Sequence, residues 1–276
     1  MSLANVSKKT VEIVDRGSYV TPSGATVDIR AAIDAALRGT LLYRPYELAE
    51  LSAHPGAEGA PPPRLSVTPE TTAEAARRLV EAEGIPHVVA LNFASAKNPG
   101  GGFLGGAKAQ EEDLARCSAL YACQLTQREF YNANRAKPSM LYTDHIIYSP
   151  EVPFFRDEHH TLLEAPFLVS LITAPAPNAG EAARNGRGEA RKVRATLDAR
   201  AGHVLAVAAA HGHRCVVLGA WGCGVFRNEP RDVADAFALW LDHPRFRGAF
   251  DRIVFAVYER NDDRPTGRIF EERLMR

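Results

Sequence analysis

From residue 64 onwards, short apolar runs alternate with longer segments in which apolar residues recur at helical spacing. The apolar runs are typical of strands buried on both faces of a sheet. We expect strands at His87–Asn92, Asp144–Ser149, Pro166–Thr173, Arg214–Ala220 and Arg252–Tyr258, with proline-rich loops after the second and third of them. Helices are expected from Thr68 to Gly84 and at Leu114–Ala136, Gly188–His211 and Glu229–Leu241. This alternation predicts a mixed α/β fold, a three-layer α/β/α domain.

The first 63 residues have a different pattern. Val6–Asp15 has helical periodicity, Ser18–Arg30 predicts a hairpin that turns at Pro22 to Gly24, and Ala31–Leu37 predicts a second helix. His54–Pro63 is rich in proline and glycine and predicts an exposed connector. We therefore expect residues 1–63 to form an N-terminal accessory segment and residues 64–276 to form the main domain.

Composition narrows the class of protein. The chain has 276 residues, 46% of them hydrophobic, and its formal net charge is zero. Such a balance gives no bulk attraction to nucleic acid. Without a long apolar run or a signal-peptide pattern, we expect a cytoplasmic protein that does not bind membranes. We also expect a monomer. The four cysteines lack the C-x2-C pairing of zinc sites, so we expect no zinc site and interpret them as reduced thiols. We also expect no other metal and no cofactor.

Asn98–Tyr121 is the most unusual stretch of the chain. Five glycines fall between Gly100 and Gly106, and an acidic triplet, Glu111 to Asp113, follows them and opens an expected helix. A strand therefore leads into a glycine loop and then into a helix N-terminus. Backbone N–H groups in such a loop favour an anion, for example a diphosphate.

Two common phosphate-binding motifs do not describe this loop. The phosphate loop G-x-x-x-x-G-K-[ST] fails, because Gly106 is followed by Ala107, Lys108 and Ala109. The match to G-x-G-x-x-G is weak, since the helix begins only near Glu111, too far from the strand for a dinucleotide-binding turn.

Gly100-Gly101-Gly102, seven further residues and then Gln110-Glu111-Glu112 resemble the signature of the poly(ADP-ribose) glycohydrolases. The preceding Leu-Asn-Phe-Ala-Ser-Ala-Lys-Asn-Pro is similar to the bacterial-type branch of that family. The resemblance implies a macrodomain-like mixed sheet. It also implies that the three glycines and Gln110 contribute to substrate binding.

A second glycine loop, Gly219–Phe226, also follows an expected buried strand and precedes a helix. Loops after parallel strands converge at one edge of the sheet, where two of them can hold one diphosphate. The loop is similar to the diphosphate loop of macrodomains, which makes Gly222, Gly224 and Val225 expected binding residues. The same resemblance places Phe226 against the distal ribose. The alternative is that both loops are merely tight turns.

The acidic triplet has a simple structural explanation, because carboxylates in the first turn of a helix are favoured by its dipole. Its position beside an anion-binding loop suggests glycoside hydrolysis, in which a carboxyl group with a raised pKa protonates the leaving oxygen. Neighbouring helical residues diverge by about 100°, so Glu111 and Glu112 do not face each other across a sugar. The resemblance implies that Glu112 is the general acid/base and that Glu111 binds ribose.

Three further polar residues are candidates for substrate contacts. Asn98 either bonds a ribose hydroxyl or forms the turn before Pro99. Tyr258 and Asn261, at the end of the last expected strand, are candidates for contact with adenine.

The expected activity is hydrolysis of the ribose–ribose O-glycosidic bond of poly(ADP-ribose), mainly from the chain end, with ADP-ribose as product. The expected partners are poly(ADP-ribose), ADP-ribose and ADP-ribosylated proteins. Two alternatives remain open: an ADP-ribose-binding module without catalysis, and a hydrolase of mono-ADP-ribose.

Overall fold

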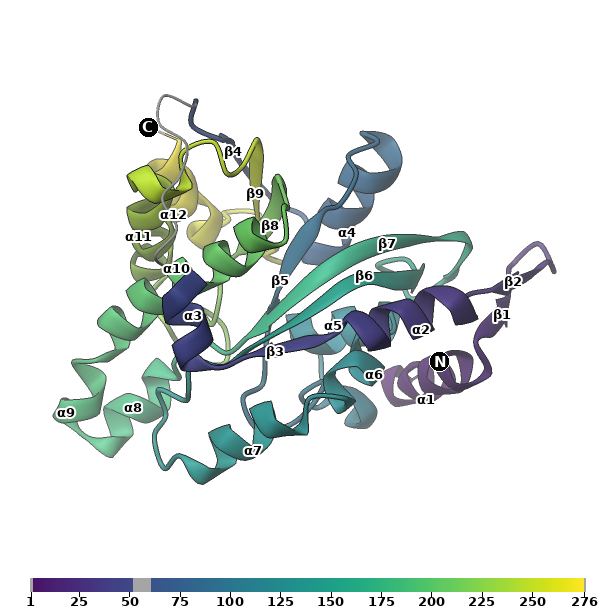
Figure 1. Ribbon diagram of the computed structural model, residues 1–276, viewed down its shortest axis with the longest axis horizontal. Helices are drawn as coiled ribbons and strands as arrows, with labels where there is room; N and C mark the ends of the chain where they lie inside the picture. Colours follow the sequence, from purple (N-terminus) through teal and green to yellow (C-terminus); the bar gives the residue numbers. More distant parts are fainter. Residues whose placement is uncertain (1, 52–60, 276) are drawn as a thin grey trace.

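The computed structural model describes residues 2–51 and 61–275. Its centre is a seven-stranded mixed sheet (Figure 1). The strand order is β3-β6-β7-β5-β8-β9-β4. The strands are β3 (Leu41–Tyr43), β4 (Arg64–Thr68), β5 (Val89–Phe93), β6 (Ile146–Arg156), β7 (Leu162–Ala174), β8 (Cys215–Gly219) and β9 (Arg252–Ala256). From β7 to β4 all neighbours are parallel, whereas β3, β6 and β7 pair antiparallel. A separate two-stranded hairpin joins β1 (Ser18–Val20) to β2 (Thr26–Asp28).

Helices cover both faces of the sheet. They are α1 (Leu3–Arg16), α2 (Arg30–Gly39), α3 (Pro45–Leu51), α4 (Thr72–Arg77), α5 (Gln110–Cys117), α6 (Leu120–Leu125), α7 (Arg128–Ala136), α8 (Ala179–Asn185), α9 (Arg187–Ala190), α10 (Val193–Ala210), α11 (Pro230–Leu241) and α12 (Pro265–Leu274). Shorter helical turns are η1 (Arg78–Ala82), η2 (Phe103–Gly105) and η3 (Pro244–Phe246). None of the helices in the described part of the chain is both long and apolar enough to cross a membrane.

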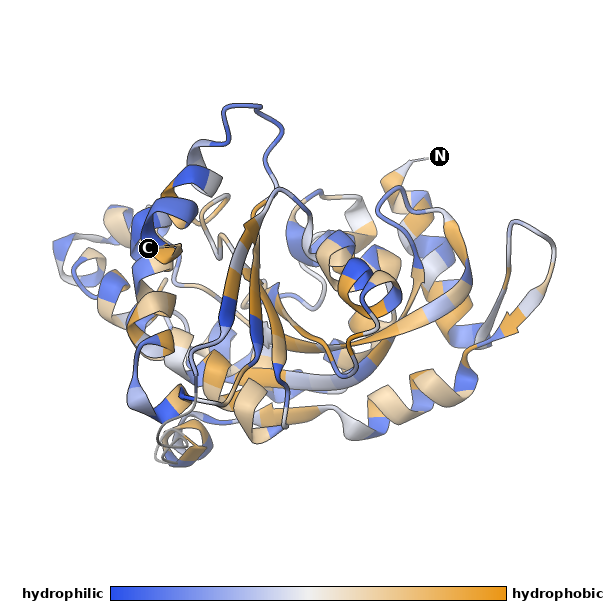
Figure 2. Cartoon of the chain, turned by 90° about the horizontal axis from the view of Figure 1, so that it is seen from above, coloured by the Kyte–Doolittle hydropathy of each residue, from blue (hydrophilic) through white to orange (hydrophobic). Residues whose placement is uncertain are grey.

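Successive residues of the central strands enter different cores. Leu91 packs with Val204 of α10 and Phe237 of α11 on one face, whereas Ala90 packs with Ile33 of α2 and Leu114 of α5 on the other. Because side chains alternate along a strand, a strand that is apolar at every position must be covered on both sides. Figure 2 shows these apolar strands enclosed between helices. The predicted three-layer α/β/α fold is confirmed.

Two strand predictions were too short. β6 continues through Pro150 and Pro153 to Arg156, and β7 begins at Leu162, so both strands extend into the region where one proline-rich loop had been expected. The pairing of β6 with β7 shifts register between Ser149 and Val152. Such a bulge takes the residue at Pro150 out of the hydrogen-bond ladder, so a proline without an N–H is tolerated there.

The expected helix starts and ends also need correction. Thr68 is the last residue of β4 and not a helix start; α4 begins after Thr71, whose side chain forms a capping box with Glu74. The segment Gly188–His211 is not one helix, because α9 ends before α10 begins at Val193. The mostly helical stretch Leu114–Ala136 is confirmed as three short helices.

The accessory segment contributes to the sheet. Its helix, hairpin and second helix lie where the sequence predicts them, and β3 then pairs with Ile146–Tyr148 at the edge of the main sheet. Most of the expected connector His54–Pro63 lies outside the described residues. The division of the chain at residue 63 stays a prediction.

Candidate active site

The two glycine loops meet at one edge of the sheet. β5 and β8 are adjacent and parallel, so the segments that follow them leave at the same carboxyl end. A cleft lies there in two compartments, of about 720 Å³ and about 630 Å³, which share lining residues such as Phe93 and Gly224. Volumes of this size suit a small-molecule ligand. Together they form one elongated cleft.

The first compartment brings together seven of the predicted site residues. Its lining includes Gln110, Glu111, Glu112, Gly222, Gly224, Val225 and Phe226. The other four predicted site residues are Asn98, Gly100, Gly101 and Gly102. They are not among the described residues that line either compartment. Gly101 and Gly102 instead lie against the carboxyl group of Glu112, whereas Gly100 lies against Tyr121 and Phe103.

Glu112 has one occupied and one free carboxylate oxygen. The Gly102 backbone N–H donates to its Oε1 at 2.8 Å. Its Oε2 is buried and has no hydrogen-bond partner within residues 2–51 and 61–275. A buried, unpaired oxygen in the wall of a cleft is costly unless a ligand or solvent bonds it. This oxygen is therefore available to exchange a proton with a bound molecule.

Glu111 is held by three donors. Its Oε1 accepts from Asn92 Nδ2 at 3.1 Å and from Gln124 Nε2 at 2.7 Å. Its Oε2 accepts from the Ser95 backbone N–H at 2.7 Å. Burial raises the pKa of Glu111 to about 8, although these hydrogen bonds act to lower it. Glu111 is thus a fixed group that joins the loop after β5 to α5 and α6.

The raised pKa of Glu111 makes stability depend on pH. The folded chain holds this proton more tightly, so the stabilisation is fully present below about pH 4.5 and is lost as the pH rises through about 8. We expect the melting temperature to fall across this window, and to fall less in Glu111→Gln, whose side chain does not titrate. Thermal denaturation of both proteins over the window measures the difference, and parallel profiles would contradict the assignment.

Gln110 links the strand to the helix. Its Oε1 accepts from the Phe93 N–H at 2.8 Å, and its Nε2 donates to the Leu91 carbonyl at 2.8 Å and to Thr72 Oγ1 at 3.0 Å. These contacts fix the start of α5 against β5. Its predicted role in substrate binding stays a prediction.

The second loop presents unpaired backbone donors. Within the described part of the chain, the N–H groups of Gly224, Val225 and Phe226 have no acceptor. Gly222 has φ +72°, and a Cβ there would lie 2.4 Å from Asn228 Nδ2 and 2.6 Å from Ala176 Cβ. Glycine is required at this turn. The free N–H groups make the loop suitable for an anion.

The first glycine loop was also expected to offer free backbone N–H groups to an anion, but its glycine N–H groups have acceptors within the protein. The Gly100 N–H donates to Gln124 Oε1 and the Gly101 N–H to the Asn98 carbonyl, at 2.8 and 3.0 Å. The N–H groups of all three glycines are therefore used inside the protein. Asn98 closes this turn with its backbone carbonyl, and the contact of its side chain with a ribose hydroxyl stays a prediction.

Several residues that build the site were not predicted. Asn92, Ser95 and Gln124 hold Glu111, while Trp221 anchors the second loop through a 3.0 Å bond from its Nε1 to the Ala174 carbonyl. Asn92 alone carries a sequence signal, as a polar residue in an otherwise apolar buried strand. The partners of the others lie too far away in the chain to be recognised.

The second compartment extends from Phe93 to the end of β9. Tyr258, Val257 and Thr71 line it, whereas Asn261 is not among the described lining residues. Cys223 also lines it, and burial raises the pKa of this thiol to about 12, which disfavours the nucleophilic thiolate near neutral pH.

One group of side chains has the composition of a metal site. Asp113, Cys117 and His160 bring a ligating atom each within 4.8 Å of the others. His160 Nε2 already pairs with Asp113 Oδ1 at 2.8 Å, and the Cys117 thiol donates to the Asp157 carbonyl. These partners satisfy the group without an ion.

A mixed sheet between two helical layers, with a cleft beyond its central parallel strands, defines a macrodomain-like protein. The model of the microbial-type PARG catalytic domain, where PARG is poly(ADP-ribose) glycohydrolase, matches residues 7–157. This chain belongs to the microbial-type poly(ADP-ribose) glycohydrolase family.

Solved structures agree with this assignment. The chain is similar to poly(ADP-ribose) glycohydrolase from Thermomonospora curvata, with 47% identity over 99% of both chains and a TM-score of 0.93. A second structure from that organism holds the inhibitor ADP-HPD and gives a TM-score of 0.90, at the same identity and coverage. The Deinococcus radiodurans enzyme in complex with ADP-ribose is 46% identical over 88% of this chain and 96% of that one, with a TM-score of 0.81. A search of curated proteins found no match.

Proposed function

We propose that this protein cleaves the ribose–ribose O-glycosidic bond of poly(ADP-ribose), mainly from the chain end, and releases ADP-ribose. The observation that carries the mechanism is the free, buried Oε2 of Glu112 in the wall of the cleft. Family membership and the ligands of the related structures support the substrate.

The second glycine loop binds the diphosphate in this proposal. The free N–H groups of Gly224, Val225 and Phe226 donate to the phosphate oxygens, and the start of α5 faces the same compartment. Phe226 packs on the distal ribose. The adenine then extends into the second compartment towards Phe93 and Tyr258.

Glu112 acts as general acid and then as general base. Its proton passes to the 2′-oxygen of the preceding unit as the bond from that oxygen to C1″ breaks, and the bonding electrons leave with the oxygen. The diphosphate stabilises the oxocarbenium-like ribose. Water then adds to C1″ and gives a proton to Glu112, which restores the acid.

Glu111 binds ribose hydroxyls in this proposal. Three acceptor positions of the Glu111 carboxyl group are taken by Asn92, Gln124 and Ser95. Because its pKa is raised to about 8, the group is mostly protonated near pH 7, and its O–H can donate to a ribose oxygen without releasing the loop. Gly101 and Gly102 contribute by lying against the carboxyl group of Glu112, and Gly100 by its bond to Gln124, which holds Glu111. Asn98 contributes a bond from its side chain to a ribose hydroxyl.

Release of ADP-ribose from purified poly(ADP-ribose) tests the activity. Chromatography of the products should show ADP-ribose as the main product from early times, as attack from the chain end requires. Binding of ADP-ribose without release would make the protein a non-catalytic reader. Release from mono-ADP-ribosylated protein but not from the polymer would support a mono-ADP-ribosyl hydrolase.

Replacement of Phe226 by alanine is expected to weaken substrate binding. A buried phenylalanine side chain contributes about 1.5–3 kcal/mol, which corresponds to a rise of about tenfold to a hundredfold in KM. Phe226→Leu keeps part of the apolar contact and should lose less. Steady-state kinetics on poly(ADP-ribose) measures both, and an unchanged KM in Phe226→Ala would contradict contact with the ribose.

We further propose that residues 1–63 form an accessory segment on a catalytic domain of residues 64–276. The four free cysteines support a reducing, cytoplasmic location. The net charge of zero supports an enzyme that acts on ADP-ribosylated proteins without binding nucleic acid directly. We propose that it works as a monomer and away from membranes.

A further inference from the structure

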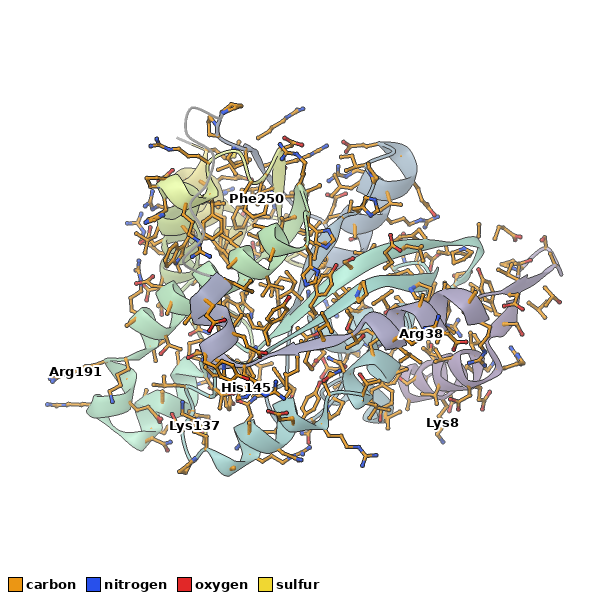
Figure 3. All side chains as sticks on the ribbon, viewed as in Figure 1. Lys8, Arg38, Lys137, His145, Arg191 and Phe250 are labelled. Carbon is orange, nitrogen blue, oxygen red and sulfur yellow. The ribbon has the colours of Figure 1, made fainter. Side chains whose placement is uncertain are left out.

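Helix α1 carries buried hydroxyl groups where a simple amphipathic helix would bury apolar ones. Its apolar residues Ile13 and Val14 pack into the core, and Lys8 points away from the molecule (Figure 3). On the buried side, however, Ser7 is 0% exposed and Thr10 is 1% exposed. Residues three apart share one face of a helix. Buried hydroxyls require partners, and these define what α1 does.

Both hydroxyls donate to backbone carbonyls of the catalytic segment. Ser7 Oγ lies 2.7 Å from the Phe103 carbonyl, in the glycine loop, and at the longer distance of 3.0 Å from the Leu3 carbonyl of its own helix. Thr10 Oγ1 lies 2.7 Å from the Arg116 carbonyl, near the end of α5. Glu112 lies between these two points in the chain. Helix α1 is thus attached to the catalytic segment on both sides of the proposed acid.

The attachment at Phe103 is close to the hydrogen bond that holds the Glu112 carboxyl group. The neighbouring residue Gly102 donates its N–H to Glu112 Oε1 at 2.8 Å. The turn that contains both residues is itself closed by a 2.9 Å bond from the Phe103 N–H to the Gly100 carbonyl. A shift of the Phe103 peptide group would therefore move the Gly102 N–H away from Glu112.

The attachment at Arg116 lies where the end of α5 is itself bonded to the glycine loop. The Arg116 guanidinium donates to the Ala107 carbonyl at 2.7 Å, which ties the end of α5 back to the loop. Arg156 donates to Thr10 Oγ1 at 3.2 Å and adds a link to β6. The loop and both ends of α5 are thus connected to one another and to α1.

We infer that Ser7 and Thr10 are positioning residues for catalysis, which hold the Gly102 N–H and the Glu112 carboxyl in the geometry that the reaction requires. The inference rests on the proposed role of Glu112. It gives the N-terminal helix a task in the reaction beyond its contribution to the core.

The test compares four variants of the full chain by kcat, KM and melting temperature. Ser7→Ala and Thr10→Val remove one hydroxyl each with little change in packing. Each is expected to lower kcat on poly(ADP-ribose) about tenfold and to leave KM nearly unchanged. The reason is that small displacements of catalytic groups slow the chemical step. Thr10→Ser restores the hydroxyl and should recover most of the loss. Ser2→Ala removes the N-cap of the same helix, whose hydroxyl accepts from the Asn5 N–H, and should lower the melting temperature without lowering kcat.

The outcomes separate the two proposals. Absence of release by the wild type would overturn the glycohydrolase proposal itself. Release by the wild type with unchanged kcat in Thr10→Val, or an equal loss of kcat in Ser2→Ala, would overturn the positioning role alone and leave α1 as a purely structural helix. If Ser7→Ala does not fold, the Thr10→Val and Thr10→Ser pair still decides the question.

Discussion

Glu112→Gln is expected to lower the rate of ADP-ribose release by about 10²–10⁴-fold, the contribution usual for general acid–base catalysis. The substituted side chain has the same shape, and its carbonyl oxygen can still accept the 2.8 Å bond from the Gly102 N–H. The amide replaces the free Oε2, so the loss is confined to proton transfer. Affinity for ADP-ribose should therefore change little.

Product release from poly(ADP-ribose), together with calorimetric binding of ADP-ribose, measures the two effects separately. Asp113→Asn is the matched control, because it removes a carboxylate from the same first turn of α5. It should alter stability through the helix dipole and the His160 pair but keep most of the turnover. Equal losses of binding and turnover in Glu112→Gln would show that the residue serves the architecture of the cleft and not proton transfer.

The parts of the site that could be predicted from the sequence are those encoded locally. Strand, glycine loop and helix follow one another in the chain, so the sequence predicts an anion site at the first loop, and the second loop repeats that order. The structure adds that β5 and β8 are neighbours, which places both loops on one cleft. The sequence could not assign the first loop's N–H groups, because their acceptors include Gln124, on a separate helix.

The supporting polar contacts were missed for the same reason. Gln124, Ser7 and Thr10 act through partners that are distant in the chain or on other elements. A single buried polar residue in an apolar face has no periodic signal. The edge strands β3 and β4 were also missed, because β3 has only three residues and β4 is partly exposed and alternates polar with apolar residues, so neither is a continuous buried apolar run.

Gly101→Ala is expected to lower kcat by about a hundredfold, because a misplacement of about 1 Å at a catalytic group can have that cost. A Cβ at this position would lie 2.4 Å from Glu112 Oε1 and 3.1 Å from Glu111 Oε2. The carboxyl group of Glu112 would have to move away from the Gly102 N–H that holds it. Gly101 also has φ +56°, a left-handed conformation that costs an alanine about 1–2 kcal/mol.

Gly105→Ala is the matched control in the same loop, because a Cβ there meets no atom within 4 Å and the backbone does not have a positive φ. Both variants lose one glycine from the loop, but only Gly101→Ala displaces the carboxylates. Steady-state kinetics and thermal denaturation should therefore show a large loss of kcat in Gly101→Ala, beyond its loss of stability, and near-normal behaviour in Gly105→Ala. Full turnover by a folded Gly101→Ala protein would mean that Glu112 does not need its bond to Gly102, and the proposed geometry of the acid would be wrong.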